Sequence, residues 1–550
     1  MKSTDIKKLY LVHSWVGLVT GVLLFVIALT GAMSVFGRPE IKIWANPDIR
    51  SGIDIDTQRI ETLIETHASH LPARFHEEIL VFMPGTRSYA NLRILFEDHE
   101  NEEAVYLTFD NQTLEVIDRQ DGTPREVFAQ RRTDIADFIV DFHADLHLGR
   151  PVGLLLTGLL GLTLMASIVT GFIIHRQKLK QLFTFRWRRS TDITLADSHK
   201  LFGVWGMIFH GVIGFSGAFL GLATVLLIPA AAFVSFGGDQ DKLIETFNTT
   251  PEPVLAQVQA PTRIADALEH ALSYDQDMRM EVMSIYGYND KNAVIYVSGV
   301  GSDNVSRQIL KYAGAEGHLD DVFGQFEKVG GVTSYILDLM FPLHFGNFGG
   351  PFVKLLWTVL GLSTALLPLS GLMLWIERGV KAKQSSVSLN TYTRFNRLIT
   401  GACGGIVLAC AALFPTQLYL IATDTIHNTG FIIGCVFFSL WLLAIAWAFL
   451  APSVSSAAKH ILYTAGVILL SVLPLNTLIT GDSVLTSTVN QQWETLIADV
   501  TLFVLGACMV FFTRKGVKAS QSATQANKTQ DDTSSAPTNT ATQHVVRLGD

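Results

Sequence analysis

The stretches HSWVGLVTGVLLFVIALTGA at residues 13–32 and HKLFGVWGMIFHGVIGFSGA at residues 199–218 are two versions of one segment. Each begins with histidine, ends in Gly-Ala, and is apolar over about the 20 residues that a helix needs to cross a bilayer. A second pair of apolar segments is also repeated, because VTG at 169–171 is matched by LSG at 369–371. The sequence therefore predicts a duplicated unit of two membrane helices. The two copies share one orientation and are expected to be related by an axis along the membrane normal.

Further apolar runs extend this pattern over most of the chain. Of the 550 residues, 49% are hydrophobic and only 16% are charged, which indicates a membrane protein carrying hydrophilic inserts. The runs long enough to span a bilayer are 11–36, 151–175, 200–234, 351–376, 398–421, 428–450, 458–479 and 494–513. The predicted fold class is a mainly α polytopic membrane protein with about eight transmembrane helices.

Two long inserts interrupt the first four helices, and both carry the pattern of a small α+β domain. In the first, residues 57–70 predict an amphipathic helix, and strands are expected in EILVFMP, ANLRILFED and AVYLTFDNQTLEVIDR with a turn at 110–112. In the second, residues 262–273 predict the helix, and EVMSIYGY, NAVIYVSG and SRQILKYA the strands. The expected division is a first transmembrane helix (1–36), an external domain (37–142), transmembrane helices two and three with a basic loop (143–234), a second external domain (235–343), a fourth transmembrane helix (344–380), a C-terminal four-helix membrane block (398–514) and a disordered tail (519–550).

Lysine and arginine residues predict the orientation of the helices. Basic residues precede the first span and fill the links at 176–189 and 378–397, whereas the links at 422–427 and 480–493 contain none. By the positive-inside rule, both termini are cytoplasmic and both inserts lie outside. The first apolar run is too long for a signal-peptide core and is interpreted as a retained helix. The first insert is acidic, which argues against a nucleic-acid partner, and the surrounding partner is membrane lipid.

The cysteines and the C-terminal tail have ordinary interpretations. All four cysteines fall in the last four spans, where they fit neither a disulfide framework nor a zinc site and are expected to be small packing residues: Cys403, Cys410, Cys435 and Cys508. Residues from about 519 onward are rich in Ser, Thr, Gln, Asn and Ala, a composition typical of a disordered segment.

Histidines placed at the ends or inside the first four spans are the strongest functional signal. A polar side chain in a bilayer is costly and usually functional. Neutral imidazoles at matching depths of one helix bundle can hold haem iron from both sides, so the sequence predicts b-type haem. The candidate cofactor-binding and iron-ligating residues are His13, His143, His147, His175, His199, His210 and His344. Two haems are expected, and seven candidates leave a third open; the catalytic residues are unknown.

On the cytoplasmic side, His13 and His199 occupy equivalent positions of the repeat and are expected at one depth. His175 ends the second span on the same side and is a rival ligand. His210 follows His199 by eleven residues, which is about three helical turns or 16 Å, so both rings are expected to point the same way.

On the outer side, His143 and His147 are four residues apart and are expected to share one side of a helix. His344 precedes the fourth span at a similar level. Which of His143 and His147 is the ligand stays open, and the other would support it. The basic residues that would pair with haem propionates are Arg150, Arg176, Lys200 and Arg378. The alternative interpretation is that these histidines only pack at the membrane interface.

Several of these stretches together resemble the PepSY-associated transmembrane family, which includes iron-regulated inner-membrane proteins and ferric-siderophore reductases. They are HSWVGLVTGVLLFVIALTGAMSVF, FHADLHLG, TGFIIHRQKLKQLFTFR, DSHKLFGVWGMIFH and PLHFGNFGG, within about residues 1–380. The helix–strand–strand order of the inserts resembles a PepSY domain. The resemblance implies four core helices, two periplasmic PepSY-like domains and b haems held by the seven histidines. The block at 398–514 departs from this pattern, and its role is open.

Together these features lead to a hypothesis of function. The chain is expected to be a multi-pass protein of the bacterial inner membrane, a haem b-dependent oxidoreductase that reduces a periplasmic Fe(III)-siderophore and so releases iron. The electron donor, a quinol or a cytoplasmic reductant, stays open. One alternative keeps the haem electron transfer but assigns another periplasmic acceptor. The other is a non-enzymatic PepSY binding or regulatory membrane protein.

Overall fold

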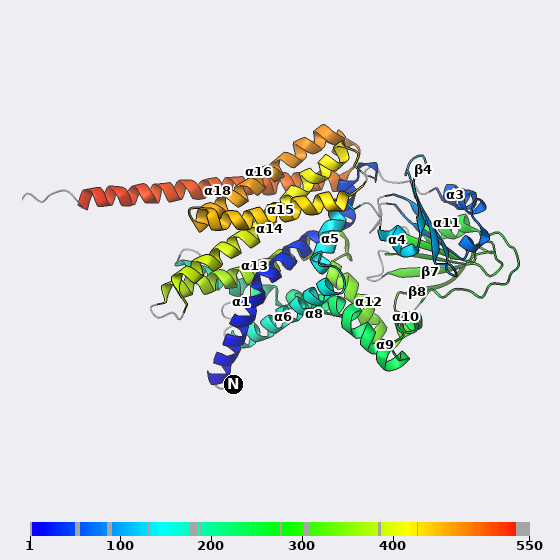
Figure 1. Ribbon diagram of the computed structural model, residues 1–550, viewed down its shortest axis with the longest axis horizontal. Coiled ribbons are helices and arrows are strands. Elements are labelled where there is room, and N and C mark those ends of the chain that lie inside the picture. The colour runs from blue at the N-terminus through cyan, green and yellow to red at the C-terminus, as the bar shows by residue number, and fades with distance from the viewer. Residues whose placement is uncertain are drawn as a thin grey trace, which may run out of the picture.

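The computed structural model describes residues 3–49, 56–84, 91–129, 133–175, 184–186, 189–247, 249–275, 278–300, 307–382, 387–425 and 427–534. Its helices form an elongated bundle, and a β-sheet domain lies beside one end of that bundle (Figure 1). Eight helices of the described residues are long and apolar enough to cross a membrane, which confirms the predicted polytopic α fold. Of the four cysteines expected to be packing residues, Cys403 and Cys410 are buried, whereas Cys435 and Cys508 are exposed.

The duplicated half of the bundle contains two equivalent sets of helices. The first set is α1 (Ser3–Ser34), the short α5 (Ile135–Asp145) and α6 (Val152–Ile174). In the second set, α7 (Thr191–Trp205) and α8 (Met207–Leu222) correspond to α1, α12 (Gly331–Phe345) to α5, and α13 (Gly350–Lys381) to α6. The second set also has α9 (Ile228–Phe236) and α10 (Gln240–Phe247), which lead out of the bundle into the second insert.

The C-terminal block is made of α14 (Leu389–Ala422), α15 (Thr429–Leu450), α16 (Val454–Thr480), the short α17 (Val484–Val489) and α18 (Trp493–Ser534). Helix α14 is its most enclosed member, with 72% of its apolar window buried. Helix α18 continues beyond the boundary at 519 where disorder was expected. Extending an existing helix adds one hydrogen bond per residue without a new nucleus, so a polar run containing Ala, Gln and Lys can prolong it. Residues 535–550 lie outside the described residues.

The strands of both inserts form one continuous sheet. The strands are β1 (Glu78–Phe82), β2 (Arg93–Asp98), β3 (Glu103–Phe109), β4 (Val116–Gly122), β5 (Arg279–Tyr286), β6 (Val294–Val300), β7 (Gln308–Ala313) and β8 (Leu319–Gly324). Their spatial order is β4-β3-β2-β1-β5-β6-β7-β8, and β1 pairs antiparallel with β5. The first strand of each insert thus joins the two halves, a pairing that the sequence analysis did not anticipate.

One face of this sheet packs against the two helices predicted at 57–70 and 262–273, observed as α3 (Thr57–Ser69) and α11 (Ile264–Tyr274). Alternate residues of the central strands, such as Ile79, Ile94 and Ile285, are fully buried beneath them. The alternation of strand side chains puts the intervening residues, among them Leu95 and Tyr106, on the other face, where they pack with α4 (Pro124–Ala129).

Candidate functional site

Four of the seven candidate histidines meet as two pairs, one at each level of the duplicated bundle. The ring centroids of His13 and His199 are 6.1 Å apart. Those of His143 and His344 are 6.0 Å apart. Each pair joins equivalent positions of the two repeats, because α1 corresponds to α7 and α5 to α12.

In the first pair, each ring is fixed by the second membrane helix of its own repeat. His13 contacts the Ser167 carbonyl oxygen and the Thr170 hydroxyl through Nδ1, both at 3.1 Å. His199 contacts the Leu367 carbonyl oxygen in the same way at 3.0 Å, and the Ser370 hydroxyl at 3.3 Å. The two rings are therefore anchored by equivalent groups of α6 and α13.

In the second pair, each ring is fixed by the first membrane helix of its own repeat. The Nδ1 atom of His143 lies 2.9 Å from the Ile27 carbonyl oxygen of α1. The Nδ1 atom of His344 lies 3.0 Å from the Ser216 hydroxyl of α8. The Ser216 hydroxyl donates its own hydrogen to the Val212 carbonyl at 2.7 Å, so it can accept from the imidazole.

These contacts define the chemical form of the four rings. A carbonyl oxygen only accepts hydrogen bonds, so the Nδ1 atom that faces it carries the ring hydrogen. In a neutral imidazole the Nε2 atom then retains its lone pair, which is the form that ligates a metal. All hydrogen bonds that the described residues make with these four rings go to Nδ1. Such a partner fixes the orientation of a ligating histidine and raises its basicity.

A Ser/Thr-Gly dipeptide accompanies each ring in the helix that holds it. A Cβ atom built on the glycine would come within 3.2 Å of the ring in every case and as near as 2.6 Å at Gly31, so glycine lets the imidazole lie close against the helix. The four dipeptides are Thr30-Gly31, Thr170-Gly171, Ser216-Gly217 and Ser370-Gly371. All four dipeptides occur in the repeated segments, so the sequence contains this signal. The match of VTG at 169–171 with LSG at 369–371 is one half of it, and Thr30-Gly31 with Ser216-Gly217 is the other half.

The donor set and spacing of the pairs fit a haem held by two imidazoles. Two metal–nitrogen bonds of about 2 Å, with roughly 1.1 Å from each nitrogen to its ring centre, give about 6.2 Å between ring centres. The observed separations are 6.1 and 6.0 Å. The two pairs also lie at different depths, since His13 and the Ile27 carbonyl that binds His143 are separated by fourteen residues of α1, which is about 21 Å.

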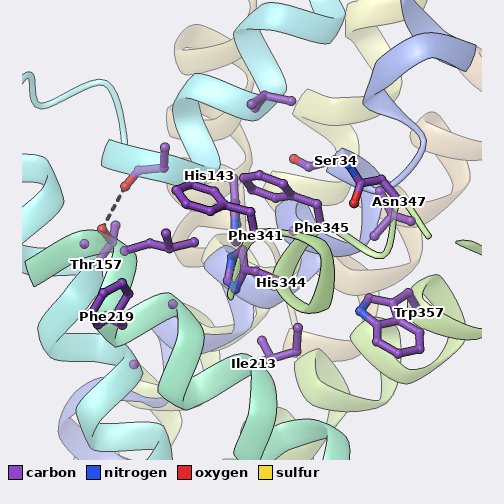
Figure 2. A pocket seen from close by; sticks show the side chains of 18 of the residues that line it. Ser34, His143, Thr157, Ile213, Phe219, Phe341, His344, Phe345, Asn347 and Trp357 are labelled. Atoms are coloured by element: carbon purple, nitrogen blue, oxygen red, sulfur yellow. Dashed lines mark hydrogen bonds between the residues drawn. The ribbon is translucent and has the colours of Figure 1, made fainter. Parts of the chain in front are cut away.

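A cavity of about 1710 Å³ surrounds the second pair and extends toward the sheet domain. Figure 2 shows His143 and His344 in it, with Phe341, Phe345 and Trp357 nearby. Its outer part is lined by charged side chains from the sheet domain, from α13 and from the segment that follows α1 (residues 35–49, the first linker): Arg38, Glu40, Arg279, Glu281, Arg307 and Lys354. The cavity is thus apolar around the imidazoles and charged at the side of the inserts.

His147 does not share a helix face with His143, and that expectation is wrong. Helix α5 ends at Asp145, and both Leu146 and His147 adopt positive φ angles. The chain therefore turns back, and His147 Nε2 lies 3.1 Å from the Phe138 carbonyl while its ring packs 4.3 Å from the Phe138 ring. His143 is the residue that meets His344.

His210 is buried, and hydrogen bonds occupy both of its ring nitrogens. Its Nε2 atom lies 3.1 Å from the Phe202 carbonyl and its Nδ1 atom 2.8 Å from the Thr364 hydroxyl. The expected continuous helix from His199 is interrupted, because α7 ends at Trp205 and α8 begins after Gly206. The ring closes this junction against α13 and has no free nitrogen in this arrangement.

The remaining candidates have different surroundings. His175 caps the C-terminus of α6, one turn beyond Gly171. Of the proposed propionate partners, Arg150 lines the cavity and Lys200 pairs with Asp197 at 3.2 Å. Arg176 lies outside the described residues.

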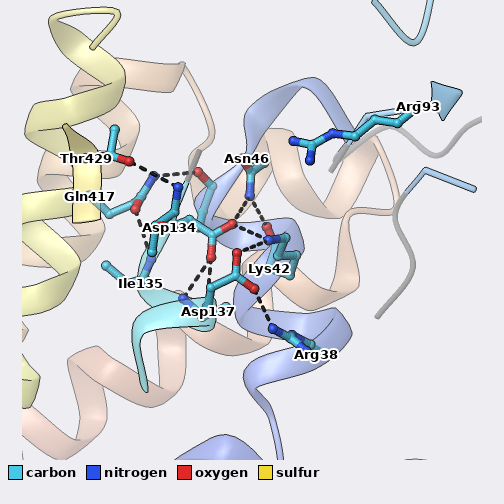
Figure 3. Close-up of polar contacts among 12 residues, drawn as sticks. Arg38, Lys42, Asn46, Arg93, Asp134, Ile135, Asp137, Gln417 and Thr429 are labelled. Atoms are coloured by element: carbon cyan, nitrogen blue, oxygen red, sulfur yellow. Dashed lines mark hydrogen bonds and ion pairs between the residues drawn. The ribbon is translucent and has the colours of Figure 1, made fainter. Parts of the chain in front are cut away.

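The C-terminal block contacts the helix that carries His143 (Figure 3). Asp134 caps the N-terminus of α5, and Gln417 of α14 accepts a hydrogen bond from the Ile135 amide. A buried ion cluster ties the same end of α5 to the first linker, with Lys42 Nζ at 2.8 Å from Asp134 and 2.7 Å from Asp137. Deeper in the block, the Asp499 carboxylate accepts from the Trp44 indole at 2.8 Å. These contacts give the additional helices a structural role in holding α5.

Comparison with known proteins agrees with this architecture. The family model described as "PepSY-associated TM region" matches residues 10–378, which contain both histidine pairs and both inserts. The chain is also 28% identical over 350 residues to "Uncharacterized protein PA4219" of Pseudomonas aeruginosa, an alignment covering 60% of this chain and 84% of that protein. The C-terminal block from α14 onward lies beyond the family match. The chain belongs to the PepSY-associated transmembrane family.

Proposed function

We propose that this protein is a haem b-containing reductase of the bacterial inner membrane that passes electrons to a periplasmic Fe(III)-siderophore. The observation that carries the proposal is the pair of two-histidine sites at different depths, each with its Nδ1 atoms anchored and Nε2 left for iron. His13 and His199 would hold one haem, and His143 and His344 the other. Bound haem supplies one-electron redox chemistry within the apolar bundle.

The residues around each pair have a defined task in this proposal. The carbonyl and hydroxyl groups hold the rings in one tautomer and one direction, which limits reorganisation at the metal. The glycines keep each ring close to its helix. The apolar helices exclude water, so the histidines stay neutral and available as ligands. Additional haem ligands are not needed for two sites of this kind, which leaves His147, His175 and His210 in supporting positions.

The cavity beside the second pair supports the assignment of an external acceptor. Its charged outer part lies between the bundle and the sheet. Arg38 pairs there with Asp137 and Arg307 with Glu281, and Arg279 is able to attract anionic groups of a chelate. One electron converts Fe(III) to Fe(II) in the chelate. Fe(II) binds hard oxygen ligands more weakly, so the iron dissociates while the chelator remains intact. The electron would come from a quinol or a cytoplasmic reductant.

The orientation belongs to the same proposal. Basic links and both termini are assigned to the cytoplasm by the positive-inside rule, so the sheet domain and the cavity face the periplasm. The first pair is then the cytoplasmic one and the second pair the periplasmic one. This order matches an electron path from inside to outside.

The test is spectroscopy of the purified full-length protein in detergent. Two b haems per chain are expected, and His199→Ala and His344→Ala should each remove one of them, while His147→Ala should retain both. Dithionite-reduced protein should be reoxidised by an Fe(III)-hydroxamate, with one Fe(II) formed per electron and trapped by a ferrous-specific chelator. Protein without haem after expression with ample haem would refute the proposal and favour a PepSY binding module. Haem-loaded protein that does not reduce ferric chelates would indicate another acceptor.

A further inference from the structure

A second group of metal-binding side chains lies in the sheet domain, outside the membrane bundle. Glu78 of β1 is directly opposite Glu97 of β2 and, on its other side, opposite Tyr286 of β5. His99 follows β2 and reaches back over the two glutamates. All three side chains belong to the first insert, where the pairing of β1 with β2 brings them together. Strand β5 of the second insert lies on the other side of β1, and β1 and β5 form the seam between the inserts.

The donor atoms of the group converge on one point. The Nε2 atom of His99 lies 2.9 Å from a Glu78 oxygen and 3.4 Å from a Glu97 oxygen. One donor atom from each of the three residues lies within 4.8 Å of the others. Ligands bound at about 2.1 Å around one metal ion are roughly 3.0–3.4 Å apart, so the observed spacing requires little rearrangement.

Negative charge exceeds positive charge at this position, where three carboxylates surround one histidine. Glu252 from the second insert adds a third carboxylate, 3.4 Å from His99 Nδ1. Among the ion pairs of the described residues, these carboxylates pair only with His99 and with no lysine or arginine. Like charges directly opposite each other on antiparallel strands are destabilising. Glu78 is moreover buried, at 9% exposure, which increases the need for a counter-charge.

The titration behaviour of the group agrees with this excess of negative charge. Burial and the neighbouring Glu78 carboxylate raise the pKa of Glu97. Burial acts to lower the pKa of His99, but the carboxylates of Glu78, Glu252 and Glu97 outweigh it, so that this pKa is raised. A divalent cation bound at this position would displace the proton from His99 Nε2 and take its place between the carboxylates.

His318 also lies beside two carboxylates, but their arrangement around the ring is different. His318 contacts Glu316 through Nδ1 at 3.1 Å and Asp320 through Nε2 at 2.9 Å. Its two carboxylates lie on opposite sides of the ring and cannot share a metal ion with one nitrogen. In the group at the seam, both strand glutamates approach the same nitrogen.

We infer that Glu78, Glu97 and His99 form a binding site for a divalent transition-metal ion at the seam of the two inserts. The mixture of one imidazole and two carboxylates suits ions such as Mn²⁺, Fe²⁺ and Zn²⁺. Glu252 of the second insert lies at the opposite ring nitrogen, 3.4 Å from Nδ1, where it would orient the imidazole rather than bind the ion. The inference stands on the sheet domain and does not depend on haem binding or on reductase activity. Metal bound here would connect β1 with the end of β2 within the first insert, beside the seam, and so stabilise that part of the sheet.

The test is a titration of the full-length protein with Mn²⁺, followed by the loss of the six-line electron paramagnetic resonance signal of the free ion. One saturable site is expected per chain, and Zn²⁺ should displace Mn²⁺ from it. Glu97→Gln and His99→Gln should each weaken binding at least about tenfold, while His318→Gln should leave it unchanged. Metal should also raise the thermal unfolding midpoint of the unaltered protein but not that of Glu97→Gln.

Two results would overturn the inference. One is the absence of saturable one-to-one binding in the unaltered protein. The other is retention of that binding in both Glu97→Gln and His99→Gln. Misfolding is separable from ligand loss, because Glu97→Gln removes a like charge beside Glu78 and should fold at least as well as the unaltered protein without metal.

Discussion

Replacing Gly31 by alanine provides a quantitative test of how the second histidine pair is held. A Cβ atom at this position would lie 2.6 Å from Cε1 of His143 and 3.0 Å from its Nδ1. Ordinary contacts of a Cβ atom begin at 3.4 Å, so the ring must retreat by the difference of 0.8 Å. A shift of this size displaces Nδ1 from the Ile27 carbonyl, which it contacts at 2.9 Å.

The expected cost follows from the loss of that orienting hydrogen bond. Removing such a partner typically weakens metal binding by about 10- to 100-fold, or about 1.4–2.7 kcal/mol. The intrinsic effect of Gly→Ala in a helix has the opposite sign, since alanine favours the helix by roughly 0.5–1 kcal/mol. Gly31→Ala should therefore keep or improve helix stability while selectively lowering occupancy of the site between His143 and His344.

The four glycines form a graded series that makes the test stringent. The shortest Cβ-to-ring distances are 2.6 Å at Gly31, 3.0 Å at Gly371, 3.1 Å at Gly217 and 3.2 Å at Gly171. Haem loss should follow this order, with the largest effect for Gly31→Ala and almost none for Gly171→Ala. Gly211 has no atom within 4 Å of its Cβ position, so Gly211→Ala is the control in the same bundle.

The assay is haem content per chain together with the low-spin ferric electron paramagnetic resonance spectrum of each variant. Gly31→Ala should lose one of two signals and retain the one assigned to His13 and His199, which serves as an internal folding control. The reasoning is refuted if Gly31→Ala retains both haems as fully as Gly211→Ala, or if the order of the series is reversed.

Three further predictions concern the surroundings of the site. His210→Leu should destabilise the protein by about 1–3 kcal/mol, because it removes the buried hydrogen bonds of the imidazole to the Phe202 carbonyl and the Thr364 hydroxyl. Haem content should stay at the unaltered level; loss of one haem would instead make His210 a ligand. Lys42→Met should lower the free energy of unfolding by about 3–5 kcal/mol, because Asp134 and Asp137 stay buried without the Lys42 ammonium group. The measurement is thermal unfolding, with Lys242→Met as the exposed control, and equal unfolding midpoints would contradict the importance of the cluster. The hydrogen bonds of Arg186 hold the pKa of Asp197 below its usual range. The ionised carboxylate therefore stabilises the folded state above its unfolded pKa of about 3.9, and this contribution is lost as pH falls below that value. Asp197→Asn should remove this part of the pH dependence of stability measured between pH 3 and 7, and an unchanged profile would exclude a contribution from Asp197.

The role of the C-terminal block also becomes clearer from its contacts. Its helices lie beyond the family match and supply no ring to either histidine pair among the described residues. They contact α5 and the first linker through Gln417 and Asp499. Because α5 carries His143, the block can influence the second pair without lining it. This connection assigns the block a supporting role.

The sequence by itself determined the membrane architecture and the candidate rings. Apolar runs of spanning length predict the eight helices because hydropathy and length are local properties. The repeat also placed His13 and His199 at one depth, since pseudo-symmetric copies place equivalent residues at equal depths, and His143, His147 and His344 were grouped on the other side. The helices and most strands of the inserts followed from their periodicity of side-chain burial, although β8 was missed.

The tertiary structure decided which rings meet and which surfaces are shared. His143 and His147 are indistinguishable by helical spacing, and only the left-handed backbone after Asp145 separates them. The pairing of β1 with β5 joins inserts about 200 residues apart, and the pairing of β1 with β2 brings Glu78, Glu97 and His99 together. His210 lies in an apolar segment like the paired histidines, but its Nδ1 atom is hydrogen-bonded to the Thr364 hydroxyl of the distant helix α13. Local patterns fix what each segment becomes, whereas contacts between segments depend on how their faces pack, which no single segment encodes.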